Sequence, residues 1–523
     1  MTTTKGIACL FQTVDEHPEP IDAEIKGEIP PWLNGTLLRN GPGKFECGDI
    51  PFNHWFDGQA LLHRFQIKDG HVTYGNRFIR GESYADSLKH GSANHLEFGT
   101  FIPPDPCQNI FSRFFSKFWH GYVPLDNTNV NIFAMKDKLY AATEANFLHE
   151  FDPQSLETLN RVDLTTEFPG DARIDIATAH PQITRDGSVL NVSIQFGAHT
   201  TYNIVQIPPS SGKSDEKPLD GGKVLCSIRP TSGLGYMHSF ALTEHYLVLT
   251  ETPLSWNILR ILTTKLFESS VVDWLHWDPN QLSRFLVIDR KEGTHVGVFT
   301  AEPFFVFHHI NAFEKNGKIH LDACCYPDSQ IIDDLYLHNV RTSKESAKKN
   351  VALAEVRRYE LPLEELGNVK EGKSLVKRAD GLDYILLNAG LELPQFNYTE
   401  KNGKEYEFVY GIGTKKFVFD HLIKVKVETK EYITWEEPEG FTSEPVFVKR
   451  PDGKDEDDGV VLSSVINTRD QTTSLLVLDA KDFKELGRAV VNGVTPMNLH
   501  GKYTSVSSVV SIKLLHQIQT FKT

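Results

Sequence analysis

The sequence has little cysteine and lacks every short motif that would identify a metal site. Six cysteines are spread over 523 residues, and no two of them form a CxxC pair. So few thiols in so long a chain do not make a disulfide framework, and we expect the adjacent Cys324 and Cys325 to stay reduced in a strand. The 21 histidines include no HExxH, no HxH and no zinc-finger spacing. A search for local motifs therefore finds no metal site.

Long apolar runs and a surplus of basic residues are missing as well. No stretch approaches the roughly 18–20 uncharged apolar residues of a membrane span. The net charge of −15 argues against a nucleic-acid-binding protein, which needs basic side chains to neutralise phosphates. The first residues, Met1 to Gly6, show neither an apolar signal region nor the Arg-rich pattern of an organelle presequence. On this basis we expect a cytoplasmic protein.

Short apolar segments separated by turn signals are abundant instead, and they predict an all-β fold. Such signals separate the segments of six hairpin candidates, which lie at 61–67 and 72–79, 130–135 and 139–143, a segment ending near 184 and 189–196, 304–313 and 319–325, 422–427 and 431–435, and 460–466 and 474–478. Their irregular spacing matches none of the familiar repeat signatures. A β-propeller with large, unequal insertions is the architecture we predict, ahead of two sandwiches in tandem.

Three segments have helical patterns, at 110–119, 256–267 and 343–358. The first places Phe111, Phe114, Phe115 and Phe118 on one face, with basic residues at its margin. This pattern is typical of a helix that lies in a membrane leaflet, and it is equally typical of a helix packed on the core. The last stretch, 505–523, has no pattern that indicates a function.

Four histidines share one context, because each follows or interrupts an apolar strand pattern. They are His180, His238, His308 and His500. Positions so far apart in sequence can converge on the axis of a propeller from different blades. A histidine at the end of a buried strand can be a metal ligand, and it can equally be a hydrogen-bonded core residue. The residues alone leave this choice open, also between His308 and His309.

Five sequence blocks carry a resemblance to a known family. They are LNGTLLRNGPG (33–43), HWFDGQALLH (54–63), PDPCQNIF (104–111), SEPVFV (443–448) and DEDDGVVLS (455–463). With these blocks the sequence resembles the carotenoid cleavage oxygenases of animals, from about residue 20 to about residue 504. The resemblance implies a single domain over 1–523, a seven-bladed β-propeller with a helical or loop cap over its metal-bearing face, and leaves 505–523 unassigned.

The resemblance also implies a site. One Fe(II) per chain would be held by His180, His238, His308 and His500, and a carboxylate behind a ligand histidine fixes its tautomer and orientation. The residues matching the remaining family positions are Glu144, Glu392 and Glu444 behind the ligands, Tyr236 as the catalytic residue that stabilises cationic character, Phe101 and Thr143 in the substrate tunnel, and Cys107 in a membrane-attachment region. For Phe101, ordinary core packing explains the residue equally well. The sequence departs from the family at Ala145 and Gln182, where relatives carry threonine and histidine.

The expected activity is cleavage of the central 15,15′ double bond of β-carotene, or of a related carotenoid, with O₂ to give retinal. The stretches GLELP (390–394) and MNLHG (497–501) favour central cleavage, because eccentric cleavers tend to carry Ile-Glu-Phe-Pro and a phenylalanine before the last ligand. The absence of a presequence favours it too, since eccentric cleavage is often mitochondrial. The alternatives are eccentric 9′,10′ cleavage, retinoid isomerohydrolysis or isomero-oxygenation, and a carotenoid-binding propeller without catalysis. We expect peripheral contact with a membrane through Cys107 and the phenylalanine-rich helix, and no obligate protein partner.

Overall fold

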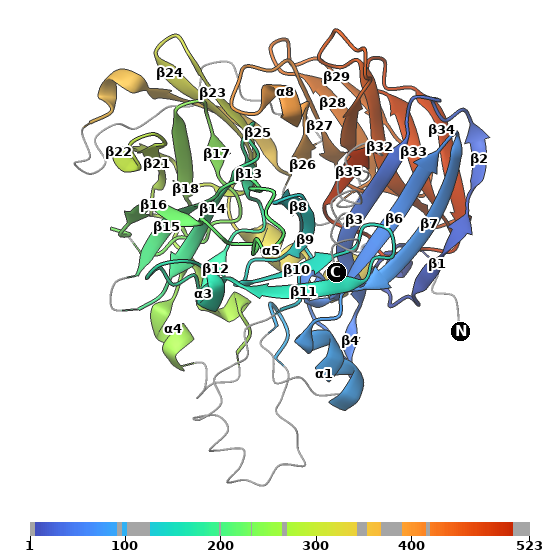
Figure 1. The fold of residues 1–523 in the computed structure, drawn as a ribbon, viewed down its shortest axis with the longest axis horizontal. Coiled ribbons are helices and arrows are strands. Elements are labelled where there is room, and N and C mark those ends of the chain that lie inside the picture. Colours follow the sequence, from blue (N-terminus) through green and yellow to red (C-terminus); the bar gives the residue numbers. More distant parts are fainter. Residues whose placement is uncertain are drawn as a thin grey trace.

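A computed structural model describes residues 6–90, 97–101, 126–197, 200–231, 233–263, 269–342, 353–367, 390–414 and 419–505. Seven sheets of three to six strands are arranged around a common centre (Figure 1). This is a seven-bladed β-propeller, as the sequence predicts. The predicted helices 110–119 and the greater part of 343–358 lie outside the described residues.

The blades follow the chain, and each is an antiparallel sheet. Blade 1 contains β1 (His17–Asp22), β3 (Gly35–Lys44), β6 (Gln59–Lys68), β7 (His71–Phe78) and β35 (Gly501–Ser505). Blade 2 contains β8 (Asn131–Met135), β9 (Lys138–Ala142), β10 (Phe147–Phe151) and β11 (Thr158–Asp163). Blade 3 contains β12 (Ile176–Ala177), β13 (Gln182–Ile183), β14 (Val189–Gln195), β15 (Thr201–Ile207) and β16 (Lys223–Ile228). Blade 4 contains β17 (Ala241–Leu242), β18 (Tyr246–Glu251), β21 (Ser283–Asp289) and β22 (Thr294–Ala301).

The remaining three blades complete the ring. Blade 5 contains β23 (Phe305–Lys315), β24 (Lys318–Tyr326) and β25 (Glu355–Pro362). Blade 6 contains β26 (Glu392–Gln395), β27 (Phe408–Gly413), β28 (His421–Lys426) and β29 (Tyr432–Trp435). Blade 7 contains β30 (Gly440–Thr442), β31 (Val446–Lys449), β32 (Gly459–Asn467), β33 (Thr472–Asp479), β34 (Glu485–Asn492) and β2 (Glu24–Gly27). Two short ribbons, β4 (Glu46–Cys47) with β5 (Ile50–Pro51) and β19 (Leu254–Trp256) with β20 (Leu275–Trp277), lie outside the blades.

The six predicted hairpin candidates are all antiparallel pairs in the structure. Their turns explain why the sequence reveals them. Asn316 and Gly317, between β23 and β24, both have positive φ, at 52° and 73°, which is the backbone of a two-residue hairpin turn and favours Asn-Gly. The middle strands of a blade are buried on both faces, because neighbouring blades cover them. Strand β33 is therefore apolar throughout its centre, at 475–478.

The two ends of the described chain close the ring together. Strand β2 pairs with β34 and so completes blade 7, while β35 pairs with β3 and completes blade 1. In the register of this second pair, Arg39 stands opposite Gly501. The hydrogen bonds of these two pairs join segments at opposite ends of the sequence, so closure depends on both ends of the chain.

Among the described residues, one short helix precedes the first strand and the others occupy connections between strands. They are η1 (Ile7–Phe11), η2 (Trp55–Asp57), α1 (Glu82–His90), α3 (Leu164–Glu167), α4 (Ile258–Thr263), η3 (Val272–Trp274), α5 (Gln330–Asp334), α6 (Leu337–Arg341), η4 (Leu363–Glu365) and α8 (Tyr398–Lys401). The predicted helix at 256–267 corresponds in part to α4. The prediction of a helix up to residue 358 is wrong over 355–358, which belong to β25 and pair with β24. None of the described helices is long and apolar enough to span a bilayer.

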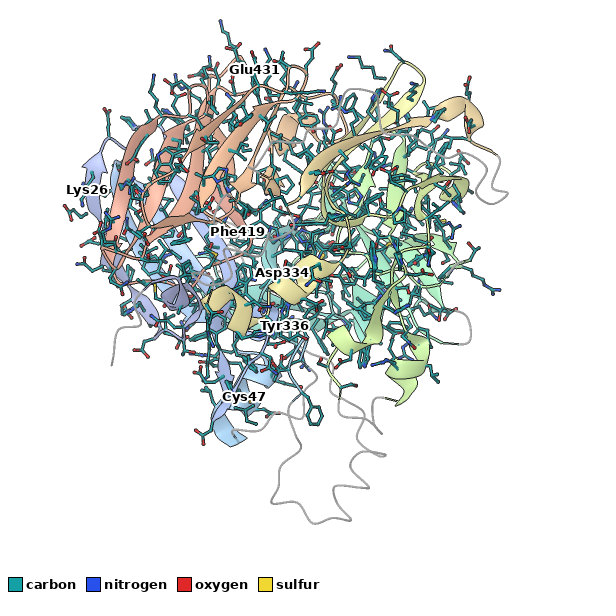
Figure 2. The ribbon with its side chains drawn as sticks, turned by 180° about the vertical axis from the view of Figure 1, so that it is seen from behind. Lys26, Cys47, Asp334, Tyr336, Phe419 and Glu431 are labelled. Atoms are coloured by element: carbon teal, nitrogen blue, oxygen red, sulfur yellow. The ribbon has the colours of Figure 1, made fainter. Side chains whose placement is uncertain are left out.

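A cap formed by α5 and α6 covers one face of the propeller. In the back view, Asp334 and Tyr336 lie near the middle of the molecule (Figure 2). The cap is fixed to η2, because the Trp55 amide donates to Leu335 O at 3.1 Å and the Leu337 amide donates to Asn53 O at 2.7 Å. This cap forms one wall of the cavity described below.

Candidate metal centre

Four histidines from four blades meet at the centre of the ring. His180 lies between β12 and β13, His238 lies three residues before β17, and His308 lies within β23. His500 directly precedes β35. Each therefore lies on or beside the strand at one end of its blade, where β17 contacts β23 and β35 contacts β8 of the next blade. The propeller thus brings together residues that no local pattern connects.

The spacing of the four imidazoles suits a metal ion. Their candidate ligand nitrogens all lie within 4.8 Å of one another, and the Nε2 atoms of His238 and His308 are 3.2 Å apart. Metal–imidazole bonds of about 2.0–2.1 Å place two adjacent ligand nitrogens about 3 Å apart and two opposite ones about 4 Å apart. The observed separations are close to these values.

A bulge in β23 separates the roles of the two consecutive histidines. Between Val306, which pairs with Cys325, and His309, which pairs with Ala323, the register against β24 shifts by one residue. Such a bulge re-aims a side chain, and His308 joins the cluster. His309 instead places both ring nitrogens against hydroxyls, Nδ1 at 2.8 Å from Ser239 Oγ and Nε2 at 2.8 Å from Thr250 Oγ1. His309 is therefore a hydrogen-bonded core residue.

Carboxylates from the three other blades lie behind three of these histidines. Nδ1 of His308 is 2.6 Å from Oε2 of Glu392, the first residue of β26. Nδ1 of His500 is 2.8 Å from Oε1 of Glu444, between β30 and β31. Nδ1 of His238 pairs with Oε1 of Glu144, in the connection between β9 and β10. All seven blades thus contribute one residue to the centre, and each carboxylate holds its imidazole with Nε2 free.

Within the part of the chain that the structure describes, His180 has no carboxylate behind it. The Asn131 amide nitrogen lies 3.4 Å from its Nδ1, and its Nε2 is buried without a hydrogen-bond partner. Burial, followed by the three neighbouring histidines, holds the pKa of His180 well below its usual range, so the ring is neutral. A buried nitrogen that lacks a partner is costly, and a metal ion bound among the four rings would satisfy it. Neutral imidazoles suit iron, zinc, copper and nickel.

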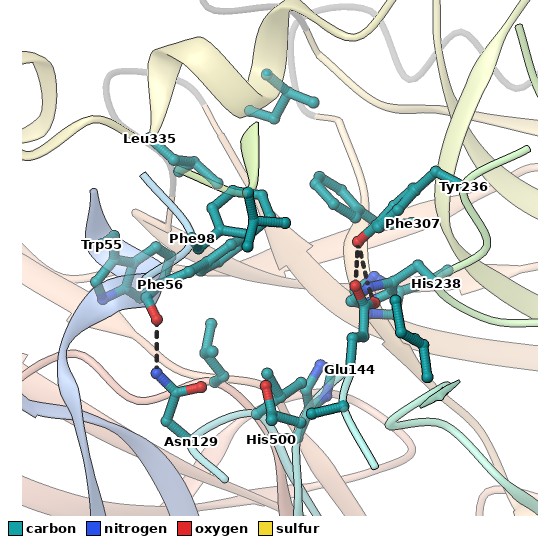
Figure 3. Close-up of a pocket in the computed structure, with 18 of the residues that line it drawn as sticks. Trp55, Phe56, Phe98, Asn129, Glu144, Tyr236, His238, Phe307, Leu335 and His500 are labelled. Carbon is teal, nitrogen blue, oxygen red and sulfur yellow. Dashed lines mark hydrogen bonds and ion pairs between the residues drawn. The ribbon is translucent and has the colours of Figure 1, made fainter. Parts of the chain in front are cut away.

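A largely apolar cavity of about 380 Å³ adjoins the histidines, within the range of small-molecule sites. His238, His308 and His500 lie in its wall together with Thr143 and Tyr236. Aromatic and aliphatic side chains form the rest of the wall. Across the cavity from His238 lie Trp55, Phe56, Phe98 and Leu335, whereas Phe307 lies beside Tyr236 and His238 (Figure 3). Ile331 and Phe419 also line the cavity. The cavity therefore offers an apolar surface directly beside the candidate metal ligands.

Tyr236 links the cavity to the carboxylate behind His238. Its hydroxyl donates to Oε2 of Glu144 at 2.6 Å (Figure 3). Burial, with a further contribution from Glu144, raises the pKa of Tyr236 well above its usual range, so the hydroxyl keeps its proton. Its ring is stacked on Phe305, with centroids 6.2 Å apart. The ring is thus held at a fixed angle in the cavity wall.

The other predicted site residues have different outcomes. Phe101 is half-buried and is not among the residues of the cavity wall, whereas Phe98 of the same segment is. Cys107, Phe111, Phe114, Phe115 and Phe118 lie outside the described residues.

Sequence reasoning missed Arg39, which is fully buried and contacts Glu444. A charged residue inside the apolar strand pattern of β3 is the signal that could have revealed it, because arginine is almost never fully buried unless it is paired.

Residues 10–505 match the model of the RPE65 family, described as retinal pigment epithelial membrane protein. Two relatives are named carotenoid-cleaving dioxygenase, mitochondrial. The protein of Mustela putorius furo is 39% identical, with 96% of this chain and 98% of the relative covered. The protein of Homo sapiens is 37% identical, with 96% and 92% covered.

Solved structures of the same architecture match almost the whole chain. Cobalt-substituted apocarotenoid oxygenase of Synechocystis has a TM-score of 0.76 at 25% identity, with 95% of this chain and 98% of that chain covered. A chimera of this oxygenase and RPE65 has a TM-score of 0.77 at 25% identity, with 96% and 100% covered.

The names of these relatives contradict the predicted cytoplasmic localisation, since both are mitochondrial proteins. That prediction rested on the composition of the first six residues. A pattern so short carries little information about import into an organelle, and the correction follows from comparison of whole chains.

Proposed function

Because this chain belongs to the RPE65 family of carotenoid cleavage oxygenases, we propose that it is an iron-dependent dioxygenase acting on a carotenoid. The reaction adds both atoms of O₂ across one C=C bond of the polyene and yields two carbonyl products. The observation that carries this proposal is the position of the histidine cluster in the wall of an apolar cavity.

His180, His238, His308 and His500 would hold one ferrous ion. The relative with cobalt in place of its native metal supports a metal at this centre. Four neutral imidazoles fill only part of the coordination sphere of iron, which, when bound, supplies a site for dioxygen. Glu144, Glu392 and Glu444 fix the rings from behind.

Residues of the cavity bind and orient the polyene. Its walls contain few polar groups, so a long hydrocarbon loses little hydration on entry and is held by shape. The face of Tyr236 lies in this wall, where an aromatic ring stabilises positive charge that develops on the substrate. Its proton stays on the hydroxyl, directed at Glu144.

For the position of the cleaved bond, eccentric 9′,10′ cleavage is the reading supported by the mitochondrial relatives. The same names support a mitochondrial location for this chain. Central 15,15′ cleavage is the second candidate. Leu391, Leu393 and Leu499, which favour it in the sequence, all line the cavity, where their size limits how far the polyene can slide.

Peripheral contact with a membrane belongs to the same proposal, since a carotenoid is dissolved in lipid. Helices α1 and α4 lie at one end of the molecule (Figure 1). Leu88 of α1 and Leu259 of α4 are 62% and 71% exposed. Exposed apolar side chains on short helices are suited to insertion between lipid head groups.

Iron content and reaction products test the proposal together. The protein is purified without oxygen, its metal is measured, and β-carotene in detergent is then added in air. One iron per chain and β-apo-10′-carotenal with β-ionone are expected. Retinal as the product would keep the reaction and move it to the central bond. Protein without iron that leaves the carotenoid intact would overturn the proposal in favour of a binding protein.

A further inference from the structure

Arg39 is a buried cation directly behind the histidine cluster. Its side chain is 0% exposed. Nε donates to Asn498 Oδ1 at 2.8 Å and Nη2 donates to Leu499 O at 2.7 Å, so the guanidinium is hydrogen-bonded to the two residues that precede His500. Nη1 donates to the carbonyl of Glu444 at 3.0 Å and to its Oε2 at 3.2 Å. A fully buried arginine requires a charged partner, and Glu444 is that partner.

Hydrogen-bond donors surround the three carboxylates of the centre. Glu444 accepts from His500, Arg39, the Gln395 amide at 2.8 Å and the Gly501 N–H at 2.8 Å. Glu144 accepts from the Tyr236 hydroxyl and from His238. Glu392 accepts from His308 and from the Leu393 N–H at 2.9 Å.

Arg39 supplies the positive charge beside these three carboxylates. Within the described residues, Arg39 is the one cationic side chain that the structure shows bonded to any of the three glutamates. Burial and Arg39 itself lower the pKa of His63, opposite Arg39 in β6, to about 3. Ser239 Oγ donates to Phe307 O at 2.7 Å, so His309 donates to Ser239 from Nδ1 and accepts the Thr250 hydroxyl on Nε2. Both rings are neutral, and the formal charges of the three carboxylates and of Arg39 around the four imidazoles sum to −2.

We propose that Arg39 sets the charge of this centre to −2, which matches a divalent ion and favours bound iron in its ferrous form. The inference rests on the iron binding in the proposed function and adds a residue that does not touch the metal. Arg39 is a positioning residue: it orients Glu444 towards His500 and compensates one of three buried charges. Without it the centre would carry −3 and match the ferric ion.

The size of the effect follows from burial. A unit charge close in space to a buried site lies in a medium far less polar than water. It therefore changes an equilibrium between two charge states of that site by about ten-fold or more. Arg39→Gln removes the positive charge and should raise the ferric-to-ferrous ratio at a fixed potential by about ten-fold. Glu444→Gln removes a negative charge and should lower that ratio by about the same factor.

The double substitution Arg39→Gln with Glu444→Gln restores −2 and separates charge from packing. The ratio is measured on iron-loaded full-length protein, equilibrated with redox mediators over a series of potentials, from the ferric signal in electron paramagnetic resonance. One electron passes between the ion and the mediator in each case. The double variant should return to within about three-fold of the unsubstituted protein, although it lacks the native contacts.

Arg358→Gln is the matched control, since Arg358 is a largely buried arginine that pairs with the buried Asp322. It should leave the ratio unchanged. If Arg39→Gln does not fold, Glu444→Gln and the double variant decide the question. Shifts of one sign in both single variants, or none, would overturn the inference while iron binding stands. Unsubstituted protein without iron would overturn the proposed function itself, and this inference with it.

Discussion

At the scale of single residues, one exposed ion pair makes stability depend on pH in a defined direction. His245 Nδ1 is 2.9 Å from Oε2 of Glu314, whose Oε1 accepts from the Thr243 hydroxyl at 2.6 Å. The Glu314 carboxylate raises the pKa of His245 above its usual value. A raised folded-state pKa means that the pair stabilises the fold below about pH 6.5, and that this contribution is lost as pH rises through the folded pKa.

We therefore expect His245→Ala to lower the melting temperature at pH 5.5 and to leave it almost unchanged at pH 8.5. The side chain is 67% exposed, so solvent screening limits the effect to about 0.5 kcal/mol. Differential scanning calorimetry at the two pH values measures it, with His245→Gln as the uncharged control. A loss of equal size at both values would show that the contribution is not ionic.

The individual site residues were accessible to sequence reasoning only in part. Turn chemistry and apolar patterns place His180 and His308 beside strands, yet 21 histidines offer many such positions. Family resemblance, and not any local pattern, selects the four that converge. Glu392 and Glu444 look like surface charges in the sequence, because their burial depends on blades that are distant along the chain. Arg39 escaped notice for the same reason.

At the scale of elements, the cap depends on a buried histidine. His54 accepts the Phe56 N–H on Nδ1 at 3.1 Å and therefore donates from Nε2 to Ile332 O of α5, at 2.9 Å. Its ring also contacts those of Phe98 and Tyr336, with centroids 4.9 Å and 5.0 Å away. His54 thus joins η2, the segment at 97–101 and the cap.

His54→Ala should loosen the cap without removing the metal site. We expect a destabilisation of roughly 2–4 kcal/mol from the cavity and the lost hydrogen bond. Hydrogen exchange should accelerate over 330–341 first, while metal content stays at the unsubstituted level, because the ligands lie on the blades. His338→Ala, on the exposed side of α6, is the matched control. Exchange that rises equally in all seven blades would contradict this localised role.

Elements with local signals were predicted well, and those set by packing were not. Asp69-Gly70 and Asn316-Gly317 adopt the positive φ angles that such pairs favour, so a few residues are enough to predict their hairpins. The charged stretch at 355–358 has helix-forming residues, yet it forms part of β25. There Arg357 and Arg358 pair with Glu355 and Asp322. Pairing with β24 outweighs intrinsic helix propensity, which is a weak preference.

At the scale of the whole molecule, a bound metal ion would cross-link blades 1, 3, 4 and 5. An ion that binds the folded state and not the unfolded chain adds about 2.7 kcal/mol at a concentration of one hundred times its Kd. Removal of the metal by a chelator should therefore lower the melting temperature, and Fe(II) or Co(II) should restore it.

Thermal melts of the metal-free and reloaded protein at one scan rate measure this effect. His500→Ala should abolish the response to metal. His276→Ala, an exposed histidine of β20, should keep it. A melting temperature that does not respond to metal in the unsubstituted protein would mean that the four histidines bind no ion of consequence for stability.

The global arrangement was the least accessible to reasoning from residues. Hairpins and an irregular spacing indicate a propeller, but the order in which blades close does not follow from them. Gly35 pairs with Ser505, and Gly27 with Gly487. Contacts of such sequence separation leave no periodic trace, because either strand alone looks like any edge strand.

Ring closure also fixes when the centre can exist during synthesis. His180 is made long before His500, and a ribosome adding about 5–20 residues per second takes some tens of seconds to cover the interval. Throughout that time the nascent chain carries up to three of the four histidines, an open ring and no β35 to pair with β3. All four histidines could therefore bind a metal ion only after residue 500 has been made. A translational pause before that residue would prolong the exposure of the unfinished ring to chaperones and proteases.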